Sequence, residues 1–240
     1  MSKRPEPFVE LELYLVRHGQ SYGNIRSEGV VRPPDEAHDP QLTPLGQRQA
    51  ELLGLHFSQL ALDKIIASGL RRAVDTASEV AKAQPKDGAH EVEVHPIFTE
   101  CGVTDAYAGR TIEEISSENN FAVAAPGTDE YERFVVWSGS RTDDLSLARA
   151  KEALAYLRSR FKRGEKVLVA AHACFNTFIF FAALGLADKE IFDPGFYNGC
   201  VTKIIFYKDG TGPYEDVSLV YSNDRSHLYR EFPELCFGDQ

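Results

Sequence analysis

The sequence predicts an α/β fold, in which a mostly parallel central sheet is flanked by helices in a three-layer sandwich. Two observations carry this prediction. Short runs of apolar, branched or aromatic residues recur along the 240-residue chain, and segments with a helical spacing of apolar residues lie between them. Strands that alternate with helices are typical of a sheet that is covered on both faces. Because no linker, internal repeat or low-complexity segment is visible, we expect residues 1–240 to form a single domain.

The expected strands are the short apolar runs. The first covers residues 13–16 and is followed directly by Arg17, His18 and Gly19, and the second covers residues 64–68. Residues 91–98 alternate as a strand does, and residues 165–172 form a buried run that ends in His172. Two more strands, at 200–207 and 216–222, are joined by the glycine-containing turn at 208–215.

The expected helices have clear start or stop signals. Thr43 is a natural N-cap and Pro44 suits the first helical position, so a helix begins there and continues toward residue 60. A second helix begins at Leu70 and ends before Pro85. Residues 111–161 look mostly helical, with breaks at 124–130 and 137–144, and another helix begins near Cys174.

The charge and the apolar runs limit the partners of the protein. The net charge of −10 argues against nucleic-acid binding and against a polybasic membrane-binding surface. The longest apolar runs, such as residues 174–187, are too short to span a bilayer. The N-terminal residues lack the apolar segment of a signal peptide. We therefore expect a cytoplasmic protein that binds neither nucleic acid nor membranes.

The cysteines are widely spaced and form no CxxC pair, which indicates free thiols rather than a disulfide framework or a zinc site. They are Cys101, Cys174, Cys200 and Cys236. Cys174 lies two residues after His172, and we interpret it as a small core side chain rather than a metal ligand. No metal site is expected.

Cationic side chains follow three of the predicted strands. Arg17 and His18 follow the first, Arg72 comes four residues after Ser68 at the end of the second, and His172 ends the strand at 165–172. If these strands are neighbours, two arginines and two histidines meet at one edge of the sheet, where ligands bind in such folds. Arginine holds two oxygens of a phosphate at once, and a neutral imidazole is nucleophilic near pH 7. Each residue alone could be structural, so the joint arrangement carries the prediction.

The segment LYLVRHGQSYGN resembles the R-H-G-[EQ]-[ST]-x-x-N signature of the histidine phosphatase superfamily, also called the phosphoglycerate mutase-like family. Further blocks resemble that family in the same order: LTPLGQRQA, ASGLRRAVDTA, VLVAAHACFN and the C-terminal YSNDRSHL. The resemblance spans nearly the whole chain. It implies a phosphoglycerate mutase-like fold with a helical insertion or lid at about residues 101–145.

The resemblance implies a covalent mechanism. His18 would attack the phosphorus of a small phosphate ester to form a phosphohistidine, which water then hydrolyses. Arg17, Arg72 and His172 would hold the phosphoryl oxygens, and Asn24 matches the family asparagine that contacts the phosphate. His18 must be neutral for this attack, and we expect its other ring nitrogen to donate to a backbone carbonyl. No metal or cofactor is implied.

A carboxylic acid must supply the proton of the leaving alkoxide. Glu100 stands where the family has its glutamate, and we favour it on position. The match after it is imperfect, because Ala108 replaces the usual second glutamate, so Asp105 is a rival for this role. A solvated loop carboxylate is the alternative interpretation of Asp105.

The same pocket could serve a phosphatase, a mutase or a phosphate-binding scaffold without chemistry. A phosphatase is favoured because both histidines and both arginines are present and the N-E-R-x-Y-G-type insertion of family mutases is absent. Aromatic residues after Glu100 could form a lid over an organic substrate or the core of a subdomain; they are Tyr107, Phe121, Tyr131, Phe134 and Trp137. Tyr22 is the aromatic residue that we expect to face the substrate. A homodimer would be compatible with the family.

Overall fold

A seven-stranded sheet forms the centre of the molecule in the computed structural model, which describes residues 6–25, 34–137, 143–186, 194–213 and 215–236. The strand order is β4-β3-β2-β5-β1-β6-β7. The strands are β1 Val9–Arg17, β2 Lys64–Ala67, β3 Val92–Val94, β4 Ala122–Ala124, β5 Glu165–Ala171, β6 Val201–Tyr207 and β7 Val217–Asp224. The first five in this order are parallel, whereas β6 is antiparallel to both β1 and β7. The sheet is therefore mostly parallel, as the sequence predicts.

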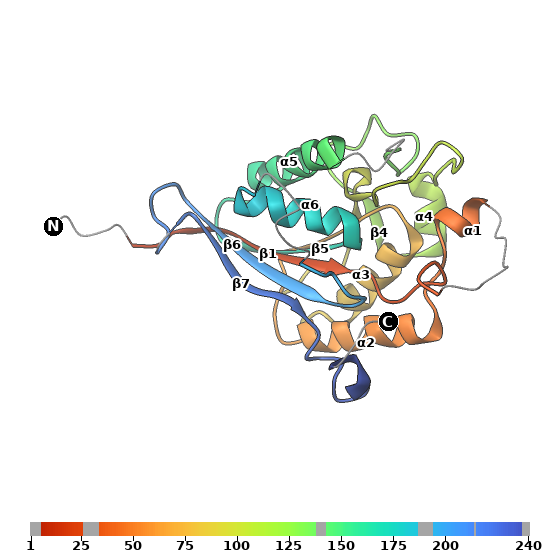
Figure 1. Cartoon of the computed structure of the whole chain (residues 1–240), viewed down its shortest axis with the longest axis horizontal. Helices are drawn as coiled ribbons and strands as arrows, with labels where there is room; N and C mark the ends of the chain where they lie inside the picture. Colours follow the sequence, from red (N-terminus) through yellow and green to blue (C-terminus); the bar gives the residue numbers. More distant parts are fainter. Residues whose placement is uncertain (1–5, 26–33, 138–142, 187–193, 214, 237–240) are drawn as a thin grey trace.

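Helices cover both faces of the sheet (Figure 1). They are α1 Pro34–His38, α2 Pro44–Phe57, α3 Arg71–Ala83, α4 Ile112–Glu118, α5 Asp143–Arg160 and α6 Ala173–Leu184, with short 3₁₀ turns at Pro96–Phe98 and Pro233–Cys236. Leu13 and Leu15 of β1 pack into a core with α5 and α6, while Tyr14 and Val16 pack into a second core with α2 and α3. Alternate side chains of one strand point to opposite faces, so this division confirms the three-layer sandwich.

The helix starting at Pro44 begins as its sequence predicts. Thr43 has extended backbone angles, and its hydroxyl accepts a hydrogen bond from the Gly46 amide at 3.0 Å. Pro44 occupies the first turn, where no intrahelical amide bond is lost. The helix then presents Ala50, Leu53 and Phe57 to the core.

The prediction that residues 111–161 are mostly helical is wrong in its middle part. α4 ends at Glu118, and the next residues form β4, which pairs with β3 through Val92 opposite Ala122. Within the described part of residues 119–137, no helix is present. The strand expected at 91–98 is also shorter, because Pro96 begins a 3₁₀ turn.

The aromatic residues after Glu100 divide between core and surface. Tyr107 and Phe134 are buried, and Phe121 packs against the core on the α2 and α3 side. Tyr131 is half-buried, and only Trp137 of this set is largely exposed. The core interpretation therefore holds for Tyr107 and Phe134. Tyr22 is exposed at 44%. In the described part of the chain, no helix combines the length and apolarity that crossing a membrane requires.

Candidate active site

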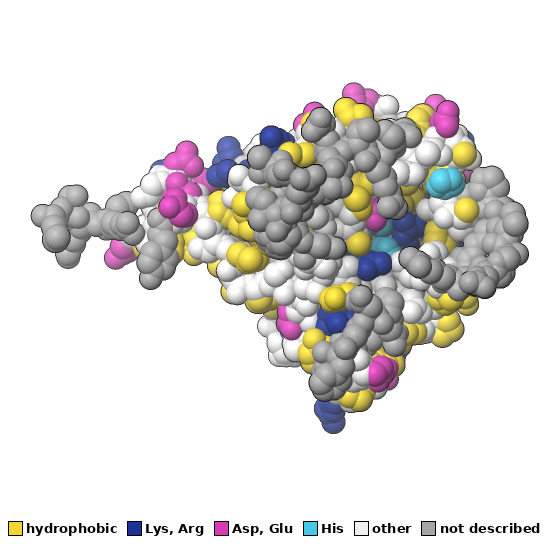
Figure 2. All heavy atoms as spheres, in the orientation of Figure 1, with side chains coloured by type: hydrophobic (Ala, Val, Ile, Leu, Met, Phe, Trp, Pro, Cys, Tyr) yellow, Lys and Arg dark blue, Asp and Glu magenta, His cyan; other side chains and the backbone are white. Residues whose placement is uncertain are grey.

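The carboxyl ends of β2, β5 and β1 lie side by side in the sheet. Arg17 at the end of β1 pairs with Ala171 at the end of β5, and Ala67 at the end of β2 pairs with Ala170. The residues that follow these strands are therefore brought to one edge. Figure 2 shows histidine and Lys or Arg atoms gathered near the carboxyl end of β1, with acidic atoms beside them.

The His18 ring is held in one tautomer. Its Nδ1 lies 2.6 Å from the Gly19 carbonyl oxygen, which can only accept, so Nδ1 carries the proton. Arg72 Nε donates to the other ring nitrogen, Nε2, over 3.1 Å. Burial, together with the charges of Arg72 and Arg17, lowers the pKa of His18 well below its usual value. The ring is thus neutral, and the lone pair of Nε2 faces a guanidinium.

The His172 ring lies beside that of His18, with 5.1 Å between the ring centroids. Its Nε2 is 2.8 Å from the Ser68 hydroxyl. Its Nδ1 is buried without a hydrogen-bond partner among the described residues. Burial, followed by the charges of Arg72 and His18, lowers the pKa of His172 well below its usual value. Buried polar atoms are normally paired, so this nitrogen is available to a ligand that enters the candidate site.

Arg17 and Asn24 are fixed by the loop before β6. Arg17 Nη1 donates to the Phe196 carbonyl at 2.6 Å. Asn24 Oδ1 accepts from the Ser21 amide at 2.9 Å, from the Ser21 hydroxyl at 3.0 Å and from Asn198 Nδ2 at 3.3 Å. Asn198 Nδ2 also donates to the His18 carbonyl at 3.0 Å, so one amide ties the histidine loop to Asn24.

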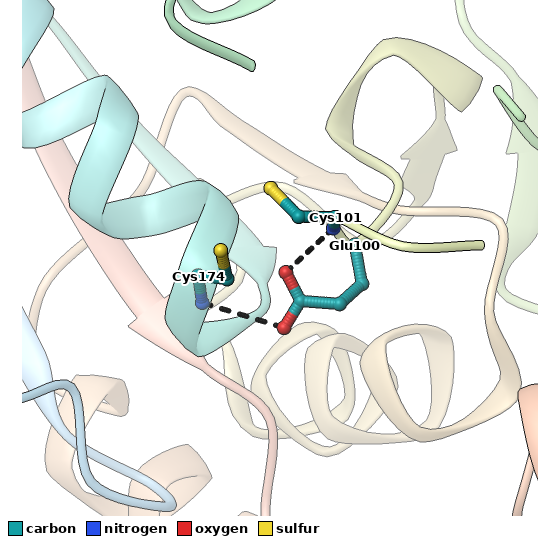
Figure 3. Close-up of side chains that lie close together, drawn as sticks. All are labelled: Glu100, Cys101 and Cys174. Atoms are coloured by element: carbon teal, nitrogen blue, oxygen red, sulfur yellow. Dashed lines mark hydrogen bonds between the residues drawn. The ribbon is translucent and has the colours of Figure 1, made fainter. Parts of the chain in front are cut away.

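The Glu100 side chain lies at the amino end of α6 (Figure 3), the helix that begins directly after His172. Its Oε1 accepts from the Phe175 amide at 3.0 Å and from the Cys101 amide at 2.8 Å, and its Oε2 accepts from the Cys174 amide at 3.3 Å. The carboxylate therefore caps the helix, where negative charge is favoured. The negative charge of Glu100 also acts on the Arg72 guanidinium, so Glu100 lies near the cationic side chains of the candidate site. Asp105 is exposed.

Several residues that support the site have no role in the sequence analysis. Ser68 is the serine of the segment ASGLRRAVDTA, and its place in that motif is a signal that could have indicated a role in the site. Asn198, Thr76 and Asn176 hold backbone atoms around the first strand: Thr76 Oγ1 accepts from the Gly19 amide at 3.0 Å, and Asn176 Nδ2 donates to the Val16 carbonyl at 3.1 Å. Because these contacts join distant parts of the chain, no local pattern reveals them.

The glycines of the first two motifs are explained by backbone contact. A Cβ atom on Gly19 would lie 2.3 Å from the Gly46 carbonyl oxygen, and one on Gly46 would lie 1.8 Å from the Gln20 carbonyl oxygen. Each glycine thus permits the histidine loop to pack directly on the first turn of α2. No local sequence signal indicates a role for Gly46, and only this close approach to the Gln20 carbonyl explains it.

Comparison with known proteins agrees with this geometry. Residues 13–214 match the family model described as histidine phosphatase superfamily (branch 1). A probable phosphatase of Schizosaccharomyces pombe is 32% identical over 96 residues, which cover 39% of this chain and 43% of that protein. Phosphoserine phosphatase 1 of Hydrogenobacter thermophilus is 38% identical over 76 residues, which cover 31% of this chain and 33% of that protein. The matches thus span less than half of each curated relative.

A solved structure shares the fold over nearly its whole length. The phosphoserine phosphatase of Entamoeba histolytica, in complex with 3-phosphoglyceric acid, superposes with a TM-score of 0.58 at 22% identity and covers 91% of this chain and 99% of that one. The fold is therefore phosphoglycerate mutase-like, as the resemblance implies. With a family model that matches most of its length, the chain belongs to the histidine phosphatase superfamily.

Proposed function

We propose that the protein is a phosphomonoester hydrolase that acts through a phosphohistidine formed on Nε2 of His18. The observation that carries the proposal is the state of the His18 ring, whose Nδ1 proton is fixed on the Gly19 carbonyl while Nε2 faces Arg72. A neutral imidazole that has one nitrogen fixed as a donor and carries its lone pair on the other is suited to act as a nucleophile once a substrate takes over the Arg72 donor. Family membership supports the same reaction.

The first chemical step transfers the phosphoryl group to His18. In the free site Arg72 Nε donates to Nε2, and the phosphate oxygens of a substrate would take over this donor. Nε2 would then attack phosphorus, a P–N bond would form and the P–O bond to the leaving group would break. Glu100 would donate a proton to the leaving oxygen and later accept one from the water that hydrolyses the phosphohistidine, releasing inorganic phosphate.

Four other groups would hold the phosphoryl oxygens during these steps. Arg17 and Arg72 supply positive charge where negative charge develops. If the Ser68 hydroxyl donates to Nε2 of His172, the other nitrogen keeps its proton, and that unpaired Nδ1–H would donate to the phosphate. Asn24 would contribute its amide N–H, since its Oδ1 already accepts from Ser21 and Asn198.

We propose a small organic phosphate as the substrate class. Phosphoserine is the first candidate, because the relative from Hydrogenobacter thermophilus and the structural neighbour from Entamoeba histolytica are both phosphoserine phosphatases. We keep the cytoplasm as the proposed location. It fits the free cysteines Cys101, Cys174 and Cys200, since reducing compartments preserve thiols.

The decisive experiment compares the wild type with His18→Ala on p-nitrophenyl phosphate in excess EDTA. We expect metal-independent turnover by the wild type and a loss of at least about 10³-fold in kcat/KM in the variant, because the nucleophile is gone. His90→Ala is the matched control, since His90 is exposed, and it should retain wild-type turnover. Activity that survives His18→Ala would contradict the phosphohistidine mechanism.

A further inference from the structure

Two thiols lie beside Glu100 at the edge of the candidate active site (Figure 3). Cys101 follows Glu100 in the chain, and Cys174 lies in the first turn of α6. The two sulfur atoms and a Glu100 carboxylate oxygen all lie within 4.8 Å of one another. The backbone amides of both cysteines donate to that carboxylate. The thiol pair is therefore coupled to the proposed proton donor.

A buried arginine makes this cluster a better place for a thiolate than for a metal cation. Arg149 Nη2 lies 3.9 Å from Cys101 Sγ, and its Nη1 donates to the carbonyl groups of Ile97 and Thr99 at 3.2 and 2.6 Å. The guanidinium also stacks on Phe175, 4.0 Å from the ring centroid, so it is firmly placed. Its positive charge favours a nearby thiolate and opposes a divalent cation.

The environment of Cys101 favours ionisation of its thiol. The pKa of Cys101 is lowered, chiefly by a hydrogen bond with the Cys174 thiol, with smaller contributions from Ser146 and Arg149. Burial and the nearby Glu100 oppose this shift. Cys200 is different, since it is fully buried and burial raises the pKa of its thiol to about 12. Of these cysteines, Cys101 therefore has the environment of a reactive thiol and Cys200 that of an inert one.

We propose that Cys101 and Cys174 form a reversible disulfide that switches off the phosphatase. The inference rests on the proposed function for its effect on activity, but the disulfide itself does not depend on it. Hydrogen peroxide is the class of oxidant. None of the catalytic or binding roles proposed above uses the thiol of Cys101 or Cys174.

The oxidation proceeds in two balanced steps. One thiolate attacks a peroxide oxygen, the O–O bond breaks, and a sulfenic acid and hydroxide form; hydroxide takes the thiol proton to give water. The second thiolate formed in this way attacks the sulfenic sulfur, the S–S bond forms and the S–O bond breaks, and the departing hydroxide takes a proton from the solvent to give a second water. Cys101 is the attacking thiolate, and Cys174, which is partly exposed, is the second thiol. A thiol reductant reverses the reaction.

We expect closure of the disulfide to displace Glu100. A disulfide requires about 2.05 Å between the sulfurs, which now lie within 4.8 Å, so the two backbone segments or their rotamers must shift. Residues 101–106 form no helix or strand, so a movement of Cys101 would break no regular hydrogen-bond pattern there. A shift of the backbone would move the amides of both cysteines, which donate to the Glu100 carboxylate. We therefore expect oxidation to misplace the proton donor.

The test treats the full chain with hydrogen peroxide, blocks the remaining thiols by alkylation and maps the cysteines by peptide mass spectrometry. We expect a linked peptide that joins Cys101 to Cys174. Phosphatase activity should fall by about tenfold or more and return with dithiothreitol. In Cys174→Ser, and separately in Cys101→Ser, the ratio of oxidised to reduced activity should stay near one.

Cys200→Ser is the matched control, because it removes an inert buried thiol and should leave the peroxide sensitivity intact. Absence of the linked peptide would overturn the proposal, and so would a linked peptide in a protein that keeps full activity. If the reduced protein has no phosphatase activity, the proposed function fails, and the linked peptide alone then decides whether the disulfide forms.

Discussion

The two histidines of the candidate site are both neutral, yet they differ in what their nitrogens contact. His18 has both ring nitrogens engaged, by the Gly19 carbonyl and by Arg72, whereas His172 has one engaged by Ser68 and one unpaired. A nucleophile needs a lone pair, and a binding group needs a proton to donate. The hydrogen-bond partners are therefore consistent with the two different roles that we propose for His18 and His172.

Glu100 and Asp105 can be separated by the leaving group of the substrate. A general acid speeds departure of a poor leaving group such as the serine alkoxide, but a nitrophenolate leaves without a proton. We expect Glu100→Gln to lower kcat by about 10²-fold or more on phosphoserine and by much less on p-nitrophenyl phosphate. Steady-state kinetics on both substrates measure this difference.

Asp105→Asn is the matched comparison, because Asp105 is exposed and should affect neither substrate. If Glu100→Gln slows both substrates equally, Glu100 serves as a helix cap and does not donate the proton. If Asp105→Asn shows the leaving-group dependence instead, the acid is Asp105.

At the residue scale, the sequence predicts the arginines and histidines that converge but not the amide and hydroxyl side chains that orient them. Arg17, His18, Arg72 and His172 stand out because two arginines and two histidines follow three of the predicted strands. Asn198 is an ordinary polar residue in a loop, and its contact with the His18 carbonyl joins positions 180 residues apart. Such contacts depend on the tertiary fold, which periodicity and motifs do not specify.

At the element scale, a buried carboxylate joins α1, α3 and the loop after Glu100. Asp39, next to α1, accepts from the Arg71 amide in the first turn of α3 at 2.6 Å and from the Tyr107 hydroxyl at 2.8 Å. It also forms an ion pair with Arg110 Nε at 3.1 Å. α3 has no capping side chain of its own, so Asp39 supplies the acceptor from a distant segment.

We expect Asp39→Asn to destabilise the fold by about 3 kcal/mol, because it removes the buried one of the two carboxylates that pair with the Arg110 guanidinium. Urea denaturation measures the change in the free energy of unfolding. Glu118→Gln is the control, since Glu118 pairs with the same Arg110 but its side chain is 45% exposed, and it should cost less than about 1 kcal/mol. An equal decrease in the free energy of unfolding in both variants would show that burial does not make the Asp39–Arg110 pair more important for stability than the exposed Glu118–Arg110 pair.

The strand that the sequence analysis missed is also explained at the element scale. β4 has only three residues, and its pattern of two alanines around Val123 carries little strand preference. It forms because it pairs with β3 at the edge of the sheet. By contrast, α2 is predicted correctly because its Thr43 cap and its helical spacing of apolar residues are local signals.

At the scale of the whole molecule, the strand order decides whether the cations meet. Convergence requires that the three strands are neighbours, and the order β2-β5-β1 confirms that they are. β5 lies between strands that precede it by about half of the chain, so no short-range signal could place it there. The site is a property of this crossover topology, since it forms where parallel strands end together.

Burial of histidines makes the stability of the whole molecule depend on pH. His95, His18 and His172 are all buried, and the pKa of each is lowered, that of His95 to about 4. For His95 the main cause is burial, followed by the charge of Arg160. In the unfolded chain these histidines take up protons near pH 6.5. Between that pH and the lowered pKa values, the unfolded chain therefore binds more protons than the folded chain does. Stability therefore falls as the pH falls below about 6.5.

His95→Asn tests this linkage without touching the candidate site. His95 Nδ1 accepts from the Ile97 amide at 3.1 Å, and an asparagine oxygen can cap the same turn without titrating. A shift from 6.5 to about 4 corresponds to about 2 kcal/mol of lost stability at pH 5. The decrease in unfolding free energy between pH 7.5 and pH 5, measured by urea denaturation, should thus be about 2 kcal/mol smaller in His95→Asn than in the wild type. His90→Asn, at an exposed position, should keep the wild-type decrease. An unchanged decrease in His95→Asn would mean that His95 does not take up its proton on unfolding, and that the pH dependence comes from other groups.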